Sequence, residues 1–90
     1  MFHLVYVLQS KADKSFYIGY TGDIRQRLSE HNQGLNFSTK SKKPWRLIFF
    51  EAYLCEKDAR RREKYLKTSQ GSRLLKRMLK GYLYLQKVEK

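Results

Sequence analysis

Five side chains in this sequence could together handle a phosphate ester. Tyr6 and Tyr17 carry phenols, Arg27 and His31 lie four residues apart, and Glu63 is the one acid in a strongly basic run. A guanidinium offers a planar fork to phosphate oxygens, an imidazole exchanges protons near neutral pH, and a single carboxylate can hold Mg²⁺. Each side chain also has an ordinary interpretation, as a core aromatic, a solvent-facing helix residue or a salt-bridge partner.

The two tyrosines fall on segments that predict paired strands. Residues 2–8 and 15–21 are rich in aromatic and β-branched residues, and the short link between them predicts a hairpin. Phenols on adjacent strands can reach one water, but a free tyrosine has a pKa of about 10, so a base role for either one requires a nearby cation or metal. Gly19 shares a strand face with Tyr17 and would let a phosphate or another backbone approach closely, or would mark a β-bulge.

Arg27 and His31 fall on a predicted helix that either Thr21 or Asp23 could cap. Their spacing of four residues places them on one face of this helix, about one turn apart. Arg25 points elsewhere on the same helix and is interpreted as a contact to a nucleic-acid backbone.

The rest of the chain predicts a layered α+β domain. We expect a polar, basic loop over residues 35–44, a strand over 45–54, a charged helix over 56–69 and, after a break at Gly71-Ser72, an amphipathic helix over 72–85. The near-continuous apolar run in the third strand indicates a central strand covered on both faces. The order β-β-α-β-α-α indicates a small sheet with helices packed on it. One domain over residues 1–85 and a short basic tail over 86–90 are expected.

Length and charge narrow the class of protein. Ninety residues suit one small core, and the net charge of +12, of which residues 35–90 carry +11, predicts a polyanionic partner such as nucleic acid. No apolar run approaches the roughly 20 residues of a membrane span, and the first residues do not resemble a secretory signal. Cys55 is alone, which excludes an intramolecular disulfide and a cysteine-based zinc site and favours a cytoplasmic location. Cys55 itself is interpreted as a small core-filling residue.

The order and spacing of the motif residues resemble the GIY-YIG nuclease domain. In chain order the matching residues are Val5-Tyr6-Val7, which keeps only the tyrosine of the first signature, then the intact Tyr17-Ile18-Gly19, Arg27, His31 and Glu63. The match spans essentially the whole chain and looks most like the small stand-alone bacterial subfamily. The resemblance implies an α+β fold with a small three-stranded, mainly antiparallel sheet flanked by helices.

The resemblance also implies an activity. A metal-dependent DNA endonuclease would hydrolyse phosphodiester bonds with one divalent ion, Mg²⁺ or Mn²⁺, and could be structure-selective and linked to DNA repair or recombination. The implied catalytic residues are Tyr6, Tyr17, Arg27, His31 and Glu63, with Glu63 as the sole protein ligand of the metal.

The basic clusters predict where the partner binds. The residues expected to contact the nucleic-acid backbone are Lys40, Lys42, Lys43, Arg61, Arg62, Lys67 and Arg73. DNA is the expected partner, RNA is also a candidate, no membrane is expected, and a protein partner could supply specificity. The alternative to an enzyme is a non-catalytic nucleic-acid-binding module with the same fold.

Overall fold

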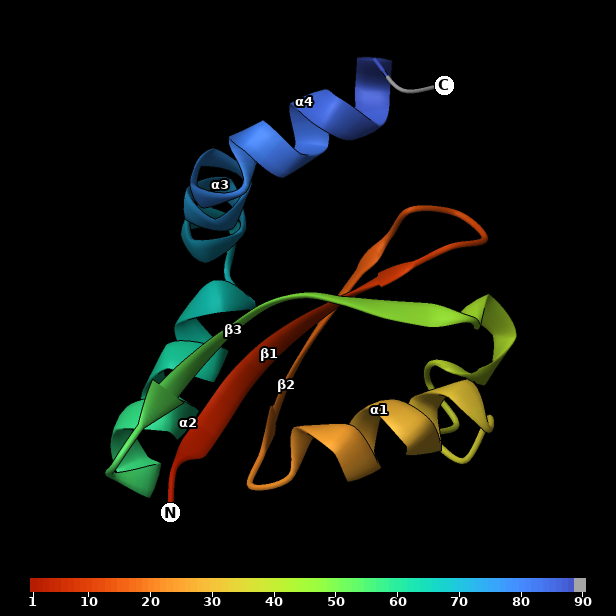
Figure 1. Cartoon of the computed structure of the whole chain (residues 1–90). Coiled ribbons are helices and arrows are strands. Elements are labelled where there is room, and N and C mark those ends of the chain that lie inside the picture. The colour runs from red at the N-terminus through yellow and green to blue at the C-terminus, as the bar shows by residue number, and fades with distance from the viewer. Residues whose placement is uncertain (89–90) are drawn as a thin grey trace.

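A three-stranded antiparallel sheet with helices on both faces forms the centre of the computed structural model, which describes residues 1–88 (Figure 1). The elements in chain order are β1 (His3–Ser10), β2 (Phe16–Thr21), α1 (Ile24–Asn32), the short 3-10 helix η1 (Lys40–Lys42), β3 (Trp45–Tyr53), α2 (Glu56–Leu66), α3 (Ser69–Met78) and α4 (Lys80–Val88). The predicted α+β class and the three-stranded antiparallel sheet are confirmed.

The central strand is β1, because the strand order is β2-β1-β3. The prediction that the third strand is central was wrong. All four residues from Val5 to Leu8 are at most 2% exposed, whereas Phe50 in β3 is 52% exposed. Helices cover parts of both faces of the sheet, so the middle of β3 is apolar although β3 is an edge strand. An apolar run therefore shows that both faces of a strand are covered, but it does not show that the strand has another strand on each side.

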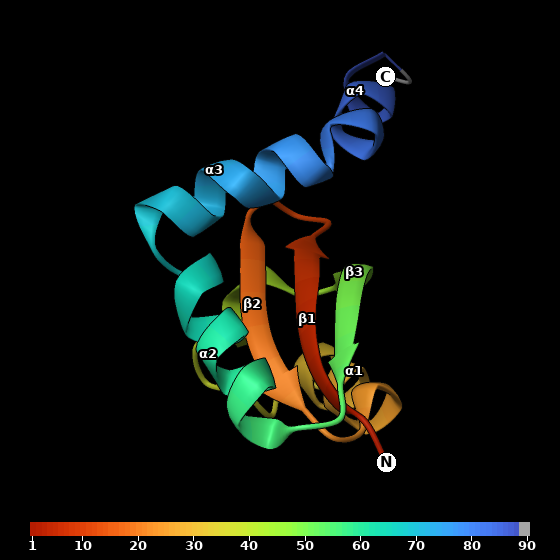
Figure 2. The same ribbon diagram turned by 90° about the vertical axis from the view of Figure 1, so that its left-hand side faces the viewer.

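The sheet separates two hydrophobic clusters, and alternate residues of β1 supply both of them. Val5 and Val7 point to the face that α2 and α3 cover, where the other buried members are Ala59, Leu66, Leu75 and Leu79. Tyr6 and Leu8 point to the opposite face, where they pack with Trp45 and with side chains of α1. Figure 2 shows α2 and α3 in front of the sheet and α1 behind it. Tyr6 therefore lies on the same side of the sheet as α1.

The C-terminal helices begin and end at other residues than predicted. The chain breaks after Leu66, and Thr68 caps the new helix by accepting a hydrogen bond from the backbone N–H of Gly71. Gly71 thus lies inside α3 and not at a break. A Cβ on Gly71 would overlap the backbone at the end of α2, so glycine allows this close approach.

The predicted helix over 72–85 is two helices in the structure, divided at Leu79. The second of them, α4, continues to Val88 and so includes residues 86–88 of the expected tail. The side chain of Gln86 forms hydrogen bonds to the side chain of Gln9 in β1, which joins this helix to the sheet. Among residues 1–88, no helix combines the length and apolar character that crossing a membrane requires.

Cys55 does not fill the core. It is exposed and precedes α2 as its N-terminal capping residue, so the interpretation of this cysteine as buried was wrong. The strand ends two residues earlier, at Tyr53, and the chain then turns outward before α2 begins.

Candidate active site

Tyr6 lies over Gly19 of the neighbouring strand. The two residues are directly paired in the β1–β2 ladder, and a Cβ on Gly19 would overlap the hydroxyl and ring of Tyr6. This close approach corrects the expectation for Gly19: a tyrosine side chain, not a phosphate or a bulge, occupies the space above it. The β1–β2 register runs without a shift, and the irregularity in β1 instead faces β3.

The hydroxyl of Tyr6 lies 3.0 Å from Nε2 of His31, and Nδ1 of the same imidazole lies 2.8 Å from the Thr39 hydroxyl. Thr39 in turn donates its hydroxyl proton to the carbonyl of Asn36 at 3.4 Å. We assign the imidazole tautomer from this bond: Thr39 Oγ1 accepts from Nδ1–H, and Nε2 accepts from the Tyr6 hydroxyl. Tyr6, His31 and Thr39 are at most 2% exposed, whereas Asn36, at the end of this chain of hydrogen bonds, is half-buried.

Tyr17 completes an aromatic cluster around the imidazole. Its ring centroid lies 6.2 Å from that of Tyr6 and 4.8 Å from that of His31. Because Tyr17 pairs with Leu8 and not with Tyr6, the two phenols are diagonal neighbours on one sheet face. From the sequence we expected the two phenols to face each other across the paired strands, whereas in the structure Gly19 faces Tyr6. Tyr17 is the more exposed of the two tyrosines.

Burial controls the protonation of the Tyr6–His31 pair. Burial first, and the neighbouring Tyr17 second, raise the pKa of Tyr6 well above its usual value, so this phenol keeps its proton at neutral pH. Burial and the positive charge of Arg27 lower the pKa of His31 below 6.5, so the imidazole is neutral there. A protonated phenol thus donates to a neutral imidazole.

Arg27 lies one helical turn before His31 and is partly exposed. Its side chain is 43% exposed, and its guanidinium forms a long ion pair with Glu30, at 3.7 Å. The positive charge of Arg27 opposes the other influences on Tyr6 by lowering the pKa of that phenol. Because the ion pair with Glu30 is long and partly exposed, the Arg27 guanidinium can exchange Glu30 for a phosphate without breaking a buried contact.

Glu63 lies on the side of the sheet opposite to Tyr6 and His31, and neither of those residues lines the hollow that Glu63 lines. It lies on α2, which runs beside β2 (Figure 2). Arg60, one turn earlier, stacks its guanidinium 4.1 Å above the ring of Tyr20 in β2, which fixes this face of α2 against the strand. The charge of Glu63 raises the pKa of Tyr6, so this carboxylate acts on the phenol electrostatically.

The carboxylate of Glu63 lies in a concave, basic surface. A hollow of about 540 Å³ is lined by Glu63 and four bases, Arg60, Arg61, Lys64 and Lys67. The side chain of Glu63 is 20% exposed and pairs with Lys67 at 2.9 Å. Within residues 1–88 no three carboxylate, imidazole or thiol side chains cluster, so a cation here would take Glu63 and complete its shell with water and phosphate oxygens. Magnesium can be held by one carboxylate with water and phosphate oxygens, so Glu63 is the residue that would hold the ion once Lys67 released it.

The seven residues expected to bind a nucleic-acid backbone fall into two regions. Lys40, Lys42 and Lys43 lie in and just after η1, close to Thr39, whereas Arg61, Arg62, Lys67 and Arg73 lie on α2 and α3. The candidates on α2 all form ion pairs. Arg61 pairs with Asp58 at 3.1 Å but is 74% exposed, so its pair exchanges readily with solvent or phosphate.

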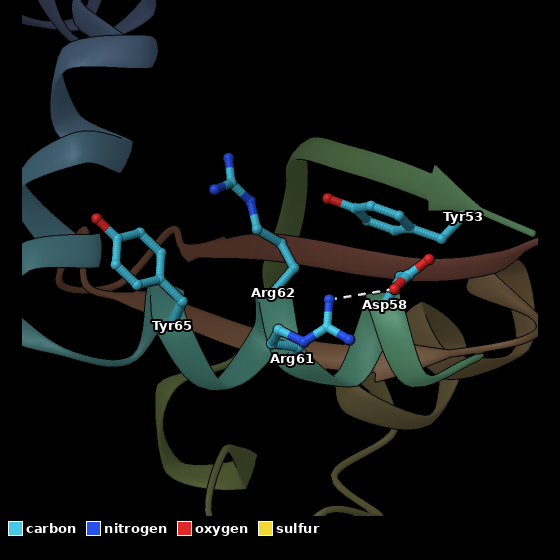
Figure 3. Close-up of a pocket in the computed structure, with 5 residues that line it drawn as sticks. All are labelled: Tyr53, Asp58, Arg61, Arg62 and Tyr65. Atoms are coloured by element: carbon cyan, nitrogen blue, oxygen red, sulfur yellow. Dashed lines mark hydrogen bonds and ion pairs between the residues drawn. The ribbon is translucent and has the colours of Figure 1, made fainter. Parts of the chain in front are cut away.

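Arg62 differs from its neighbour because it belongs to a structural network. Its guanidinium forms two hydrogen bonds to Glu51 of β3, at 2.9 and 3.1 Å, and Glu51 also accepts from the Tyr53 hydroxyl. Arg62 and Tyr53 border a separate hollow of about 490 Å³, lined by Tyr53, Asp58, Arg61, Arg62 and Tyr65 (Figure 3). None of the five motif residues lines this hollow.

Two positioning residues were missed from the sequence. Thr39 accepts from His31, and its carbonyl accepts from Nε1 of Trp45 at 2.9 Å. Asn32 joins the end of α1 to the start of β3, since its side chain bonds both the N–H and the carbonyl of Trp45. A threonine in a basic loop and an asparagine at a helix end are common, so neither carried a signal before the fold was known.

The fold and the order of the motif residues agree with the GIY-YIG domain that the sequence resembles. The family model of the GIY-YIG catalytic domain matches residues 2–77, and the chain belongs to this family of nucleases. It is 39% identical over 66 residues to the UPF0213 protein YazA of Bacillus subtilis (strain 168), covering 72% of this chain and 66% of that protein. It is 36% identical over 75 residues to the UPF0213 protein SH2523 of Staphylococcus haemolyticus, covering 82% and 90%.

A solved structure agrees with this assignment. The solution NMR structure of the UPF0213 protein BH0048 from Bacillus halodurans superposes with a TM-score of 0.55, at 32% identity over 87% of this chain and 85% of that chain. The chain is thus similar in sequence and in fold to small bacterial UPF0213 proteins, and the predicted family is confirmed.

Proposed function

We propose that this protein is a metal-dependent endonuclease that hydrolyses phosphodiester bonds of DNA. The observation that carries the proposal is the buried hydrogen bond from the Tyr6 hydroxyl to Nε2 of His31, at 3.0 Å. A phenol with a raised pKa is a poor base when alone, but a neutral imidazole behind it can take its proton. The pair acts as one unit in place of a deprotonated tyrosine.

The proton path runs from water to the imidazole. As the attacking water bonds to phosphorus, it gives a proton to the Tyr6 oxygen, and Tyr6 passes its own hydroxyl proton to Nε2 of His31. The bond between phosphorus and the leaving oxygen breaks, and that oxygen takes a proton from solvent. Thr39 holds the opposite ring nitrogen in place throughout, because Nδ1–H donates to its hydroxyl. Tyr17, beside both rings, orients the water.

We assign charge stabilisation at the phosphate to Arg27 and Glu63. Arg27 contacts the non-bridging phosphate oxygens, where its partly exposed guanidinium can exchange Glu30 for the substrate. Glu63 holds Mg²⁺ or Mn²⁺, which when bound supplies further positive charge at the phosphate. Lys67 is the cation that Glu63 must release to do so.

The basic residues hold DNA without reading its sequence. Exposed lysines and arginines bind phosphates by charge, a mode that favours shape over sequence. We assign this role to Lys40, Lys42, Lys43, Arg61, Lys67 and Arg73, and a smaller part to Arg62, whose guanidinium is committed to Glu51. Structure-selective cleavage suits a part in DNA repair or recombination. A cytoplasmic location stays a prediction.

A panel of labelled DNA and RNA structures tests the proposal. Duplex, nicked, flapped, branched and single-stranded forms are incubated with Mg²⁺ or Mn²⁺ and with wild type or the variants Tyr6→Phe, Tyr17→Phe and Glu63→Gln. We expect metal-dependent cutting of DNA by wild type and none by Glu63→Gln, which still binds. The matched control is Glu56→Gln, an exposed acid on the same helix, which should cut normally.

Two results would contradict the proposal. Binding in gel shift with no cutting of any form would favour the non-catalytic module, and cutting confined to RNA would change the substrate. Wild-type rates in Glu63→Gln would remove the role given to that carboxylate.

A further inference from the structure

The loop between α1 and η1 presents two large apolar side chains to solvent. Leu35 is 68% exposed and Phe37 is 84% exposed, the highest value for any phenylalanine in residues 1–88. Single exposed apolar residues are ordinary on protein surfaces, so exposure alone does not mark a site. Three further features of this loop do.

First, the loop is internally hydrogen-bonded. The Asn36 side chain accepts from the N–H and hydroxyl of Ser38 at 3.0 and 2.7 Å. The Asn36 carbonyl accepts from the N–H groups of Thr39 and Lys40 at 3.2 and 3.0 Å. These bonds fix a turn with Phe37 at its outer side, so the ring is already held in an exposed position.

Second, a cation lies against the exposed ring. The ammonium of Lys40 lies 4.9 Å from the centroid of Phe37, whereas Lys42, two residues later in η1, pairs with Asp13 at 3.5 Å. An exposed apolar ring beside a lysine, in a basic segment, suits a partner with a negatively charged backbone and flat apolar faces. Nucleic acid has both, since phosphates meet the lysines and bases stack on the ring.

Third, the loop is joined to the candidate active site. Thr39, two residues after Phe37, accepts from His31 Nδ1 and holds the Trp45 indole through its carbonyl. Both partners are buried. A base that contacts Phe37 would therefore lie two residues along the chain from Thr39, which orients the imidazole.

We propose that Phe37, with Leu35 in the same turn, inserts between bases of bound DNA and unstacks a base step beside the bond to be cut. Unstacking costs free energy, and the cost is least where the duplex is already interrupted. The protein consequently binds nicked or bulged DNA more tightly than a continuous duplex. The cleavage position rests on the proposed function, but insertion itself is a property of binding.

Fluorescence of 2-aminopurine in DNA, without divalent metal, tests the insertion. Nicked duplexes carry the probe at successive positions on either side of the nick and are titrated with the full chain. We expect wild type to raise the fluorescence at one or two adjacent positions. Phe37→Ala should abolish that rise and weaken binding to nicked DNA by roughly 5- to 150-fold, the effect of losing about one base–aromatic stack.

Two variants serve as controls. Tyr84→Ala removes another exposed aromatic ring, 64% exposed on α4, and should retain the rise. Phe37→Trp keeps a stacking ring and should also retain it. Because Phe37 is exposed, its alanine variant should fold, which circular dichroism confirms.

The proposal is overturned if wild type unstacks no position, if Phe37→Ala unstacks as wild type does, or if sedimentation shows that Phe37 instead joins two copies of the chain. Insertion and cleavage are separable here. If the protein unstacks bases through Phe37 but never cuts DNA, insertion is supported and the proposed nuclease activity is contradicted. If the wild type cuts DNA but Phe37→Ala still unstacks bases normally, the nuclease activity is supported and insertion is contradicted.

Discussion

The hydroxyl of Tyr6 donates to Nε2 of His31 across 3.0 Å, from the central strand to the last turn of α1. Both side chains are at most 2% exposed. This single bond joins the two halves of the candidate site and makes the buried histidine a proton acceptor with a fixed tautomer. It therefore contributes to stability as well as to the proposed reaction.

Tyr6→Phe should lower the free energy of unfolding and stop cleavage. The buried acceptor on His31 loses its partner, which costs about 1–3 kcal/mol. Tyr17→Phe keeps the ring packing of a half-buried side chain and should change stability by no more than about 0.5 kcal/mol. Urea unfolding and DNA nicking are measured for both. A Tyr6→Phe variant as stable and active as wild type would disprove the relay.

Gly19→Ala should be far more harmful than Gly22→Ala, three residues later. A Cβ on Gly19 overlaps the Tyr6 hydroxyl, so we expect a loss of about 1–3 kcal/mol from overpacking, together with loss of cleavage. A Cβ on Gly22 meets nothing within 4 Å. Thermal unfolding of the two variants makes the comparison, and equal melting temperatures would show that Tyr6 moves aside freely.

Stability should decline as the pH falls below about 6.5, the ordinary pKa of histidine. Burial lowers the pKa of His31, so below this pH the unfolded chain binds a proton that the folded protein does not. The contribution of His31 is complete above pH 6.5 and is lost progressively down to its lowered pKa. Urea titrations at several pH values should show this slope in wild type. In His31→Gln the slope should be smaller, and an unchanged slope would assign it to other groups.

Lys67→Met should tighten Mn²⁺ binding. Lys67 pairs with Glu63 at 2.9 Å and competes with a cation for that carboxylate. Because the lysine is half exposed, the gain should be at most about fivefold, or ~1 kcal/mol. Lys64→Met, on the same helix and in the same hollow, is the control for lost charge. Mn²⁺ titration followed by electron paramagnetic resonance would show equal affinities if the Lys67–Glu63 pair does not matter.

We expect Arg61→Met to weaken DNA binding and Arg62→Met to lower the stability of the fold. Arg62 forms two bonds to Glu51, its side chain is 25% exposed, and its loss should lower the melting temperature more than the loss of Arg61. Arg61 is 74% exposed, so its removal should leave stability unchanged. If Arg61 contacts one phosphate, the slope of log binding constant against log salt should decrease by about 0.9. If Arg61→Met lowered the melting temperature and Arg62→Met lowered the salt dependence of binding, the roles given to the two arginines would be wrong.

Sequence reasoning identified the family, the α+β class and the elements that carry the motif. These followed from local signals: a strand pattern around Tyr6, an i, i+4 spacing for Arg27 and His31, and an unusual acid at Glu63. Such signals lie in the residues themselves and depend little on what packs against them.

Tertiary structure decided the rest. The order of the strands in the sheet could not be predicted from the sequence, because β3 is apolar on both faces although it lies at an edge of the sheet. The partner of His31 was equally hidden, since Thr39 reaches it only after the loop folds back along α1. Arg61 and Arg62 are adjacent residues of the same type, but in the folded protein Arg61 is exposed to solvent and Arg62 pairs with Glu51. The spacing of apolar residues in the sequence predicts which face of a helix or strand a residue occupies. Contacts between distant segments depend instead on how the helices and strands pack against one another.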